Sequence, residues 1–333
     1  MSGQKKKNWL ITGGCGFLGT SLIQHLRKYD LANHIRVLDN LTVGTGEDLA
    51  QVCDFRESAL SALQQSPAPA ATELVQGDIR NPKTCVACCQ NMDIVIHLAA
   101  NTGVPVSVEH PRLDMESNVI GTFNMLDAAR GHKIERFVFA SSGAPAGEVE
   151  PPIHEELPPH PVSPYGASKL AGEGYCSAYC KSFGLETVTL RFSNVYGPGS
   201  THKSSVVAKF IKQALQGETL VIYGDGTQTR DFIYIDDLIN ALVLAATQEG
   251  IGGETFQIAT SRETTLDEVT ELLLSVLAEN GIQYPRVDKT EPRLGDVKRN
   301  FSDTSKAKAM LGWQCNWQLD DGLQKTVEWF LSR

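Results

Sequence analysis

Basic residues are in the minority in this chain. Its 333 residues include 30 lysines and arginines against 39 aspartates and glutamates, which gives a formal net charge of −9 at pH 7. Proteins that bind nucleic acids present an excess of positive charge to the phosphates. We therefore expect no nucleic-acid partner.

Long apolar runs are also missing. No stretch approaches the roughly 18–20 residues that a membrane-spanning helix requires. Lys5, Lys6 and Lys7 precede an apolar run that is too short for a signal peptide. We therefore expect a cytoplasmic protein with no membrane partner.

Paired cysteine motifs are scarce among the eight cysteines. Cys85, Cys88 and Cys89 cluster, and Cys176 and Cys180 lie one helical turn apart. A structural zinc site takes four ligands, and no second Cys-x-x-Cys is present to complete one. We expect buried, reduced thiols and no metal.

Apolar runs and helical patterns alternate through roughly the first 190 residues, which is typical of a parallel sheet with helices on both faces. After Gly199 the segments become shorter and richer in turns. We predict an α/β protein, with a Rossmann-type doubly wound parallel sheet and a smaller C-terminal α/β substrate-binding domain. The predicted strands are residues 8–12, 34–38, 74–79, 94–100, 136–140 and 187–192.

We also predict how the chain divides between the two domains. Residues 1–196 and 229–262 would form the Rossmann domain. Residues 197–228 and 263–333 would form the smaller domain.

A glycine-rich turn follows the first predicted strand, with the sequence Thr12-Gly13-Gly14-Cys15-Gly16-Phe17-Leu18-Gly19, and a helical pattern begins after it. This context is typical of a dinucleotide site. Gly13 permits the tight turn, Gly16 lets the backbone approach a pyrophosphate, and Gly19 lets the helix pack on the strand. The diphosphate would rest on the helix N-terminus.

An ordinary glycine-rich loop is the alternative, and Asp39 argues against it. This residue ends the second predicted strand, 20 residues after Gly19. A carboxylate there accepts hydrogen bonds from a ribose and repels a 2′-phosphate, so it predicts NAD rather than NADP. Asp78 and Ile79, in the third run, are placed to reach the adenine. We predict that His97 is a core histidine.

The sequence Tyr165-x-x-x-Lys169 follows Ser142, and none of the other seven tyrosines of the eight has a lysine four positions on. Pro164 suits the first turn of a helix, which would place Tyr165 and Lys169 on one face. Lys169 and a positively charged nicotinamide ring would lower the pKa of the phenol from near 10 to about 7. Tyr165 would then take a proton from a substrate hydroxyl that Ser142 orients. The alternative is a surface tyrosine beside a solvated lysine.

These motifs resemble the extended short-chain dehydrogenase/reductase family, in its NAD-dependent nucleotide-sugar epimerase and dehydratase branch, closest to the UDP-hexose 4-epimerases. The resemblance covers nearly the whole chain. Its further motifs are Leu38-Asp39-Asn40, Gly77-Asp78-Ile79-Arg80, His97-Leu98-Ala99-Ala100, Asn118-Val119, Gly121-Thr122, Asn194-Val195-Tyr196-Gly197 and Tyr223-Gly224-Asp225-Gly226.

The resemblance implies that a UDP-sugar is oxidised to a keto intermediate and that the hydride is then returned. Ser142, Tyr165 and Lys169 would be catalytic. NAD would be bound by Gly13, Gly16, Phe17, Leu18, Gly19, Asp39, Asn40, Asp78, Ile79, Leu98, Ala99, Ala100, Asn118, Tyr165 and Lys169. The substrate would be bound by Thr102, Ser142, Asn194, Val206, Tyr223, Arg230, Arg293, Asp296 and Asn300.

Among those substrate residues, Asn194, Arg230 and Arg293 would contact the diphosphate. The resemblance implies further that Tyr223 lies beside the uracil and that Asp296 binds the nucleotide ribose.

Two departures from the family pattern bear on the sugar. Sugar 4,6-dehydratases carry Asp-Glu directly after the catalytic hydroxyl residue and UDP-glucuronate decarboxylases carry Glu, whereas this chain has Gly143 and Ala144. That difference favours simple epimerisation. Asn300 stands where the glucose/galactose enzymes carry a tyrosine, and the smaller side chain predicts room for an N-acetylated sugar.

Two alternatives stay open. One is another nucleotide-sugar epimerase, a reductase, a dehydratase or a UDP-glucuronate-type enzyme of the same branch. The other is a non-catalytic NAD-binding regulator, against which the retained Ser142, Tyr165 and Lys169 argue. Helices predicted over residues 113–129 and 165–183 would otherwise expose apolar faces, so we expect a homodimer.

Overall fold

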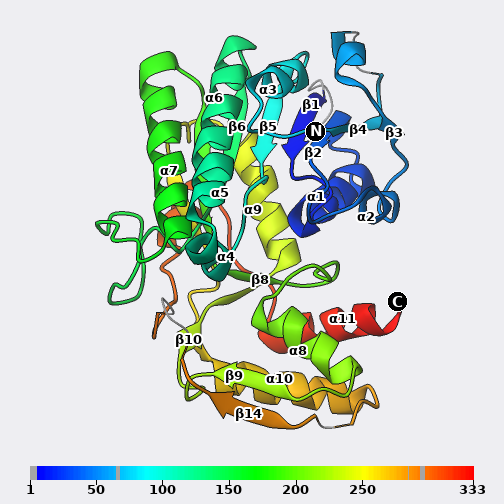
Figure 1. The fold of residues 1–333 in the computed structure, drawn as a ribbon. Coiled ribbons are helices and arrows are strands. Elements are labelled where there is room, and N and C mark those ends of the chain that lie inside the picture. Colours follow the sequence, from blue (N-terminus) through cyan, green and yellow to red (C-terminus); the bar gives the residue numbers. More distant parts are fainter. Residues whose placement is uncertain (1–5, 65–67, 284, 293–296) are drawn as a thin grey trace.

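The computed structural model describes residues 6–64, 68–283, 285–292 and 297–333. Within these residues, an eight-stranded parallel sheet forms the larger part of the molecule (Figure 1). Its strand order is β12-β7-β6-β5-β1-β2-β4-β3, which confirms the predicted Rossmann-type sheet. The strands are β1 (Lys7–Thr12), β2 (Ala32–Asp39), β3 (Arg56–Glu57), β4 (Thr72–Gln76), β5 (Ile94–His97), β6 (Arg136–Ser142), β7 (Thr187–Phe192) and β12 (Thr255–Ile258).

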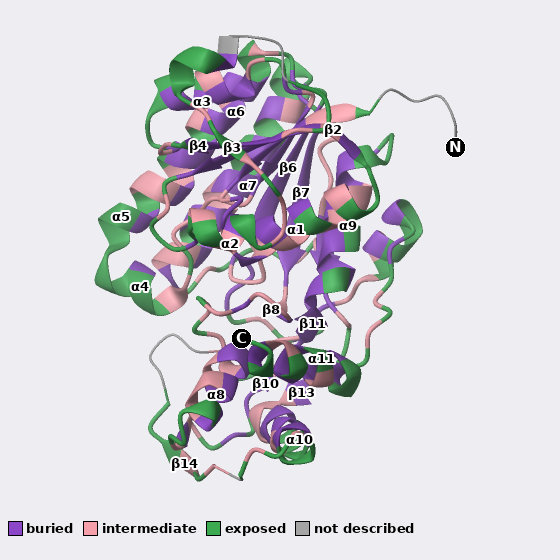
Figure 2. Ribbon diagram, turned by 90° about the vertical axis from the view of Figure 1, so that its right-hand side faces the viewer, coloured by how far each residue is buried: buried purple, intermediate pink, exposed green. Residues whose placement is uncertain are grey.

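Apolar residues cover both faces of the sheet, because alternate side chains of each strand point to opposite sides. Trp9 and Ile11 of β1 join one hydrophobic core, whereas Leu10 joins the other. The strands are accordingly buried over most of their length (Figure 2). This double burial explains why they appear in the sequence as continuous apolar runs rather than as alternating patterns.

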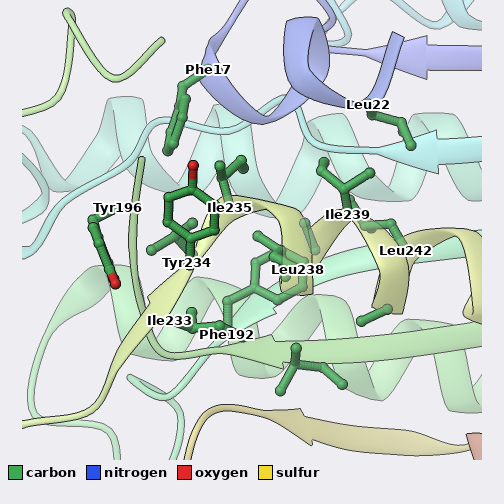
Figure 3. Packing of buried hydrophobic residues seen from close by; sticks show 14 of the residues in the cluster. Phe17, Leu22, Phe192, Tyr196, Ile233, Tyr234, Ile235, Leu238, Ile239 and Leu242 are labelled. Carbon is green, nitrogen blue, oxygen red and sulfur yellow. The ribbon is translucent and has the colours of Figure 1, made fainter. Parts of the chain in front are cut away.

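Helices α1 (Phe17–Lys28) and α9 (Ile235–Thr247) pack together and supply one of the two cores. Figure 3 shows Leu238, Ile239 and Leu242 projecting from α9 into this core, with Leu22 of α1. The second core lies under α3 (Pro82–Cys89), α6 (Gly121–Gly131) and α7 (Pro164–Phe183). Three shorter helices, α2 (Gly46–Ala50), α4 (Val104–Glu109) and α5 (Pro111–Met115), and a 3₁₀ turn, η1 (Leu60–Gln64), lie in the connections.

A smaller part lies beyond the carboxyl ends of the strands (Figure 1). Asp237 of α9 ties it to the sheet, since its carboxylate accepts hydrogen bonds from the amides of Asn316 and Trp317. The elements outside the main sheet are β8 (Asn194–Tyr196), α8 (Val206–Leu215), β9 (Leu220–Tyr223), β10 (Thr229–Arg230), β11 (Phe232–Tyr234), β13 (Thr264–Thr265), α10 (Leu266–Glu279), β14 (Val287–Thr290), η3 (Ala307–Leu311) and α11 (Leu319–Leu331).

Two predicted strands end earlier than expected. The third ends at Gln76 rather than at residue 79, because the Asp78 carboxylate accepts the amide of Arg80 and closes a turn there. The fourth ends at His97 rather than at residue 100. There the amide of Ala99 donates to the Thr12 hydroxyl instead of to a strand carbonyl.

The helix predicted over residues 113–129 is interrupted. A π-helical turn, η2 (Glu116–Ile120), separates α5 from α6. Its Asn118 side chain bonds the backbone of Asn101 in both directions, with distances of 2.7 and 2.9 Å. Such turns are frequent at functional sites, and this one lies against α7.

Candidate active site

The glycine turn holds the start of α1 close to two strands. Gly13 has a φ of +68°, and a Cβ there would lie 2.8 Å from the Ala99 amide nitrogen. A Cβ on Gly19 would lie 2.4 Å from the Cα of Gly14. Both positions therefore require glycine because of the protein's own packing.

Gly16 differs from its two neighbours. Its φ is an ordinary −76°, and the nearest atom to a Cβ there would be the Gly13 carbonyl oxygen at 3.4 Å. Gly16 caps α1 without a side-chain hydrogen bond. The first amides of the helix are thus available to bind an anion. A Cβ on Gly16 would fill the space in which that anion would lie.

Asp39 ends β2 directly beside this turn and is 8% exposed. Its Oδ2 accepts the Cys15 amide and its Oδ1 accepts the Leu41 amide, both at 2.9 Å. Burial raises its pKa, and these backbone hydrogen bonds oppose the rise. Each carboxylate oxygen retains further acceptor capacity, so a ribose hydroxyl can still bind.

The remaining predicted cofactor residues line the same edge of the sheet. The Asn40 side chain lies 3.5 Å from the Asp78 carboxylate. Ile79 packs against Gly121, and a Cβ added to Gly121 would lie 2.5 Å from the Ile79 side chain. The Leu98 amide donates to the Thr12 carbonyl oxygen. Phe17 and Leu18 are the first two residues of α1, and Ala99 and Ala100 directly follow Leu98 after β5.

His97 is a core histidine, as predicted. It is 1% exposed, and its ring nitrogens lie 2.8 and 3.1 Å from the hydroxyls of Thr12 and Thr122. Burial, with a smaller effect of Lys169, lowers its pKa to about 3, so the ring is neutral. Its role is to join β5 to β1 and α6.

Ser142, Tyr165 and Lys169 come together between β6 and α7. Ser142 is the last residue of β6, and its side chain forms a hydrogen bond with that of Tyr165. Tyr165 is the second residue of α7, whose N-cap Ser163 accepts the Gly166 amide at 3.1 Å. A cap of this kind is worth about 1 kcal/mol and fixes where the helix begins.

Small residues let α7 approach β6 closely. A Cβ on Gly166 would lie 2.7 Å from the Ala144 carbonyl oxygen, and one on Gly172 would lie 2.4 Å from the Phe139 ring. The Lys169 ammonium group donates to the Ala140 carbonyl oxygen at 2.8 Å and lies 5.9 Å from the Tyr165 ring centroid.

Burial governs the titration of Tyr165 and Lys169. It raises the pKa of Tyr165 to about 12, although the hydrogen bond with Ser142 lowers it. It lowers the pKa of Lys169 to about 8, whereas Asp114 and Glu173 raise it. The predicted phenol pKa of about 7 combined Lys169 with a cationic nicotinamide ring. The protein's own groups hold Tyr165 neutral at neutral pH, so the prediction depends on the charge of the cofactor.

Asp114 is a buried carboxylate of this site that the sequence analysis missed. It is 1% exposed and accepts a 2.9 Å hydrogen bond from Asn118. Burial raises its pKa, whereas Ser168 and Lys169 oppose that rise. The other nearby carboxylate, Glu173, is already paired with Arg191 at 2.7 Å. The available signal was the i, i+4 spacing of Asp114 and Asn118 on a helix packed against α7.

Asn118, which was predicted to bind the cofactor, is also hydrogen-bonded within the protein. Its amide group bonds the backbone of Asn101, the Asp114 carboxylate and, at 3.2 Å, the Ser168 hydroxyl. It therefore joins the connection after β5 to the first turn of α7, which carries Tyr165.

Several predicted substrate residues lie at the junction with the smaller part. Asn194 begins β8, and Val206 begins α8. Tyr223 ends β9, with the Lys209 ammonium group 5.1 Å from its ring centroid. Arg230 lies on β10, and its guanidinium donates to the Thr229 and Val297 carbonyl oxygens at 2.6 and 2.8 Å.

Asn300 lies beside the segment that follows Ser142. A Cβ on Gly143 would lie 3.8 Å from the Asn300 Nδ2. Thr102 is exposed in the connection before α4. Arg293 and Asp296 lie outside the described residues.

All eight cysteines are free thiols. Burial raises the pKa of Cys85 and of Cys88 to about 12, so both are protonated. Within the part of the chain that the structure describes, no group of three or more His, Cys, Asp or Glu side chains could hold a metal ion. None of the helices formed by these described residues is long and apolar enough to cross a membrane.

Residues 9–259 match the model of the NAD dependent epimerase/dehydratase family. The chain belongs to this family and is an NAD-dependent enzyme. The residues around Gly16 and Asp39 fit that cofactor, since they offer free amides for a diphosphate and a carboxylate for a ribose.

The chain is similar to nucleotide-sugar 4-epimerases. It is 35% identical over 328 residues to a putative UDP-glucose 4-epimerase of Methanocaldococcus jannaschii, covering 96% of this chain and 97% of that protein. The Thermotoga maritima UDP-glucose 4-epimerase, solved with UDP-glucose, has a TM-score of 0.86 at 32% identity, covering 98% and 99%. A Methanobrevibacter ruminantium UDP-N-acetylglucosamine 4-epimerase has a TM-score of 0.86 at 30% identity, covering 99% of both chains.

Proposed function

We propose that this enzyme epimerises the C4 hydroxyl of a UDP-hexose. The observation that carries the proposal is the meeting of Ser142, Tyr165 and Lys169 at the end of β6. This end of the sheet also holds the glycine turn, so a sugar beside Ser142 would face a bound nicotinamide. The similarity to 4-epimerases over nearly the whole chain supports the same reaction.

Each member of the trio has one role in this proposal. Ser142 donates a hydrogen bond to the sugar hydroxyl and orients it. Tyr165 takes the proton from that hydroxyl at its phenolic oxygen and later returns it. Lys169 contributes positive charge beside the phenol, held in place by the Ala140 carbonyl. NAD, when bound, supplies the hydride acceptor and donor.

The Tyr165 phenol can lose its proton near neutral pH only with more positive charge nearby than the protein provides, because its pKa is about 12. A shift to about 7 would take roughly 7 kcal/mol of differential stabilisation. The cationic nicotinamide of the oxidised cofactor is a source of that charge. Proton abstraction is thereby coupled to the oxidation state in which a hydride can be accepted.

The sugar would lie between Ser142 and Asn300, in the space that Gly143 and Asn300 border. Tyr223, Arg230 and Asn194 would bind the nucleotide part, together with Arg293 and Asp296. Gly143 and Ala144 supply no acid next to Ser142, which favours epimerisation over elimination of water.

We assign residues 1–196 and 229–262 to the cofactor-binding domain and residues 197–228 and 263–333 to the nucleotide-sugar-binding domain. Asn194 and Arg230 of the first domain would reach the substrate at the border between the two. The inclusion of β12 in the main sheet supports the first assignment. We place the enzyme in the cytoplasm.

A homodimer is supported by an aromatic surface on α6 and α7, which lie side by side (Figure 1). Phe123 and Phe183 are 38% and 55% exposed. The Phe123 ring lies 5.6 Å from that of Tyr175, and Tyr179 lies 5.0 Å from Phe183. An exposed aromatic cluster of this kind is typical of an interface.

The decisive experiment follows the products by NMR when purified enzyme, without added cofactor, meets a panel of UDP-, dTDP- and CDP-sugars. We expect interconversion of a UDP-hexose at C4 and NAD(H) in the denatured supernatant. A dehydrated 4-keto sugar as the stable product would establish the alternative reaction. Binding without any turnover across the panel would support the non-catalytic regulator.

A further inference from the structure

A lysine from outside the Rossmann sheet reaches the start of α1. Lys203 lies in residues 197–205, which connect β8 to α8. Its Nζ lies 5.5 Å from the centroid of the Phe17 ring. Phe17 is the first residue of α1 and follows Gly16, so the ammonium group stands beside the helix start that the glycine turn presents.

This cation has no anionic counterpart in the described part of the chain. The side chain is partly buried, and burial lowers the pKa of Lys203 to about 8 with no carboxylate opposing it. The first turn of α1 carries no acidic residue either. A partly desolvated ammonium group without a counter-ion is unfavourable, and an anion bound beside it would relieve that cost.

The backbone around Lys203 is fixed from two sides. The Lys212 ammonium group of α8 donates to the Thr201 and Lys203 carbonyl oxygens, both at 2.9 Å. On the other side, His202 Nε2 lies 3.1 Å from the Asp48 carboxylate of α2. Residues 197–205 therefore contact both α8 and α2, and the backbone of Lys203 is held between these two helices.

Residues 197–205 also pack against the start of α1. A Cβ on Gly199 would lie 3.5 Å from the Phe17 ring, which is ordinary van der Waals contact. Phe17 itself is 9% exposed and belongs to the core. The Phe17 ring is therefore held in place by the core and provides a fixed apolar surface beside the Lys203 ammonium group.

We propose that Lys203 binds a phosphate oxygen of the NAD diphosphate, so that residues 197–205 act as a strap that retains the cofactor. The helix start beside Phe17 is where a dinucleotide's diphosphate binds in this fold. The residues assigned to the substrate's diphosphate, Asn194 and Arg230, lie instead on β8 and β10. The position of Lys203 therefore favours the cofactor over the UDP-sugar as the source of the phosphate.

The test measures cofactor retention rather than turnover. Lys203→Met keeps the length and the apolar stem but removes the charge, and Lys203→Arg restores a cation. We expect Lys203→Met to release bound NAD about 10- to 100-fold faster during dialysis, since a hydrogen bond to a charged group is lost. Lys203→Arg should retain NAD nearly as the parent does. Lys308→Met, at an exposed lysine of η3, is the matched control and should be unchanged.

A second measurement separates the two diphosphates. UDP is titrated into each variant by calorimetry at saturating NAD, and we expect equal affinities. Unchanged NAD release in Lys203→Met would overturn the proposal. So would weakened UDP binding with normal NAD release, which would place Lys203 at the substrate instead. Lys203→Gln repeats the test with a neutral polar side chain, and thermal melting at saturating NAD checks that each variant is folded.

Discussion

Lys169 donates its hydrogen bond to the backbone carbonyl oxygen of Ala140, two residues before Ser142, and not to a carboxylate. This hydrogen bond joins α7 to β6 close to the point where the Tyr165 and Ser142 side chains contact each other. Because the acceptor is neutral, the ammonium group keeps its full positive charge for the phenol. The geometry of the trio is therefore set by the strand as much as by the helix.

Replacing Tyr165 by Phe removes the proposed base and leaves the ring that packs in its place. We expect kcat to fall by roughly 10²- to 10⁴-fold. Steady-state assay on the UDP-hexose identified by NMR measures the loss. Tyr175→Phe, at an exposed tyrosine of the same helix, is the control and should retain parental activity. Near-parental turnover in a folded, NAD-loaded Tyr165→Phe enzyme would remove Tyr165 from the mechanism.

Asn300→Tyr tests the size of the sugar pocket. Asn300 lies beside Gly143, so a tyrosine ring would fill the space between them. We expect the parent enzyme to act on UDP-GlcNAc as well as on UDP-glucose, and the variant to lose the former. The kcat/KM ratio for the two sugars is the measurement, and thermal melting is the control for folding. An unchanged ratio would move substrate choice to residues 143–147.

The pH dependence of the reaction should move when Asp114 is neutralised. The negative charge of Asp114 disfavours the phenolate and so raises the pKa of Tyr165. Asp114→Asn should lower that pKa, because the repulsion is lost. The ascending limb of kcat/KM against pH would then shift to lower pH.

The control for this profile is Asp127→Asn, which removes a surface carboxylate paired with Arg130 on α6. Its profile should match that of the parent. A shift of the Asp114→Asn limb to higher pH, or no shift, would show that Asp114 does not act on Tyr165 through its charge.

Two glycines of the turn should respond in opposite ways to alanine. Gly16→Ala adds a Cβ that meets only the Gly13 carbonyl oxygen, at 3.4 Å, so the fold should tolerate it while the diphosphate loses its cradle. Gly19→Ala places a Cβ 2.4 Å from Gly14 and should destabilise the protein by about 1–3 kcal/mol. Chemical denaturation and NAD content distinguish the outcomes. Equal loss of stability in both variants would contradict this division.

Phe123→Glu tests the proposed dimer. A carboxylate at this exposed position on α6 would place a charge among the aromatic rings of α7. We expect light scattering to show a monomer where the parent is a dimer. Val43→Glu, at another exposed apolar residue, serves as the control and should leave the mass unchanged. A parent that is itself monomeric at assay concentration would refute the homodimer.

The sheet could be predicted because its strands are buried on both faces. Short apolar runs such as Ile94-Val95-Ile96 indicate buried strands. The alternating Val188, Leu190 and Phe192 indicate a strand over residues 187–192, and β7 has these bounds. The ends of β4 and β5 could not be predicted, since they depend on side chains that cap the strands, such as that of Thr12. The π-helical turn depends on Asn118 finding Asn101, a contact that exists only after folding.

The candidate site was predictable in its members but not in its electrostatics. Spacing placed Tyr165 and Lys169 on one helical face. It could not reveal how strongly the surrounding protein, whose own groups raise the phenol pKa to about 12, opposes ionisation of Tyr165. It also could not reveal Asp114, because an acidic residue in a helical pattern is most often solvated. Lys203 was also missed, because it lies in a connection that carries no sequence motif.

The two backbone hydrogen bonds that Asp39 accepts, from Cys15 and Leu41, join the glycine turn to the residues after β2. The turn is thus rigid by virtue of the protein's own contacts. A receptor that already has the bound shape loses little conformational entropy when its ligand arrives, and a larger share of the contact energy remains as affinity. An enzyme that must keep one dinucleotide through many cycles of oxidation and reduction benefits directly from such preorganisation.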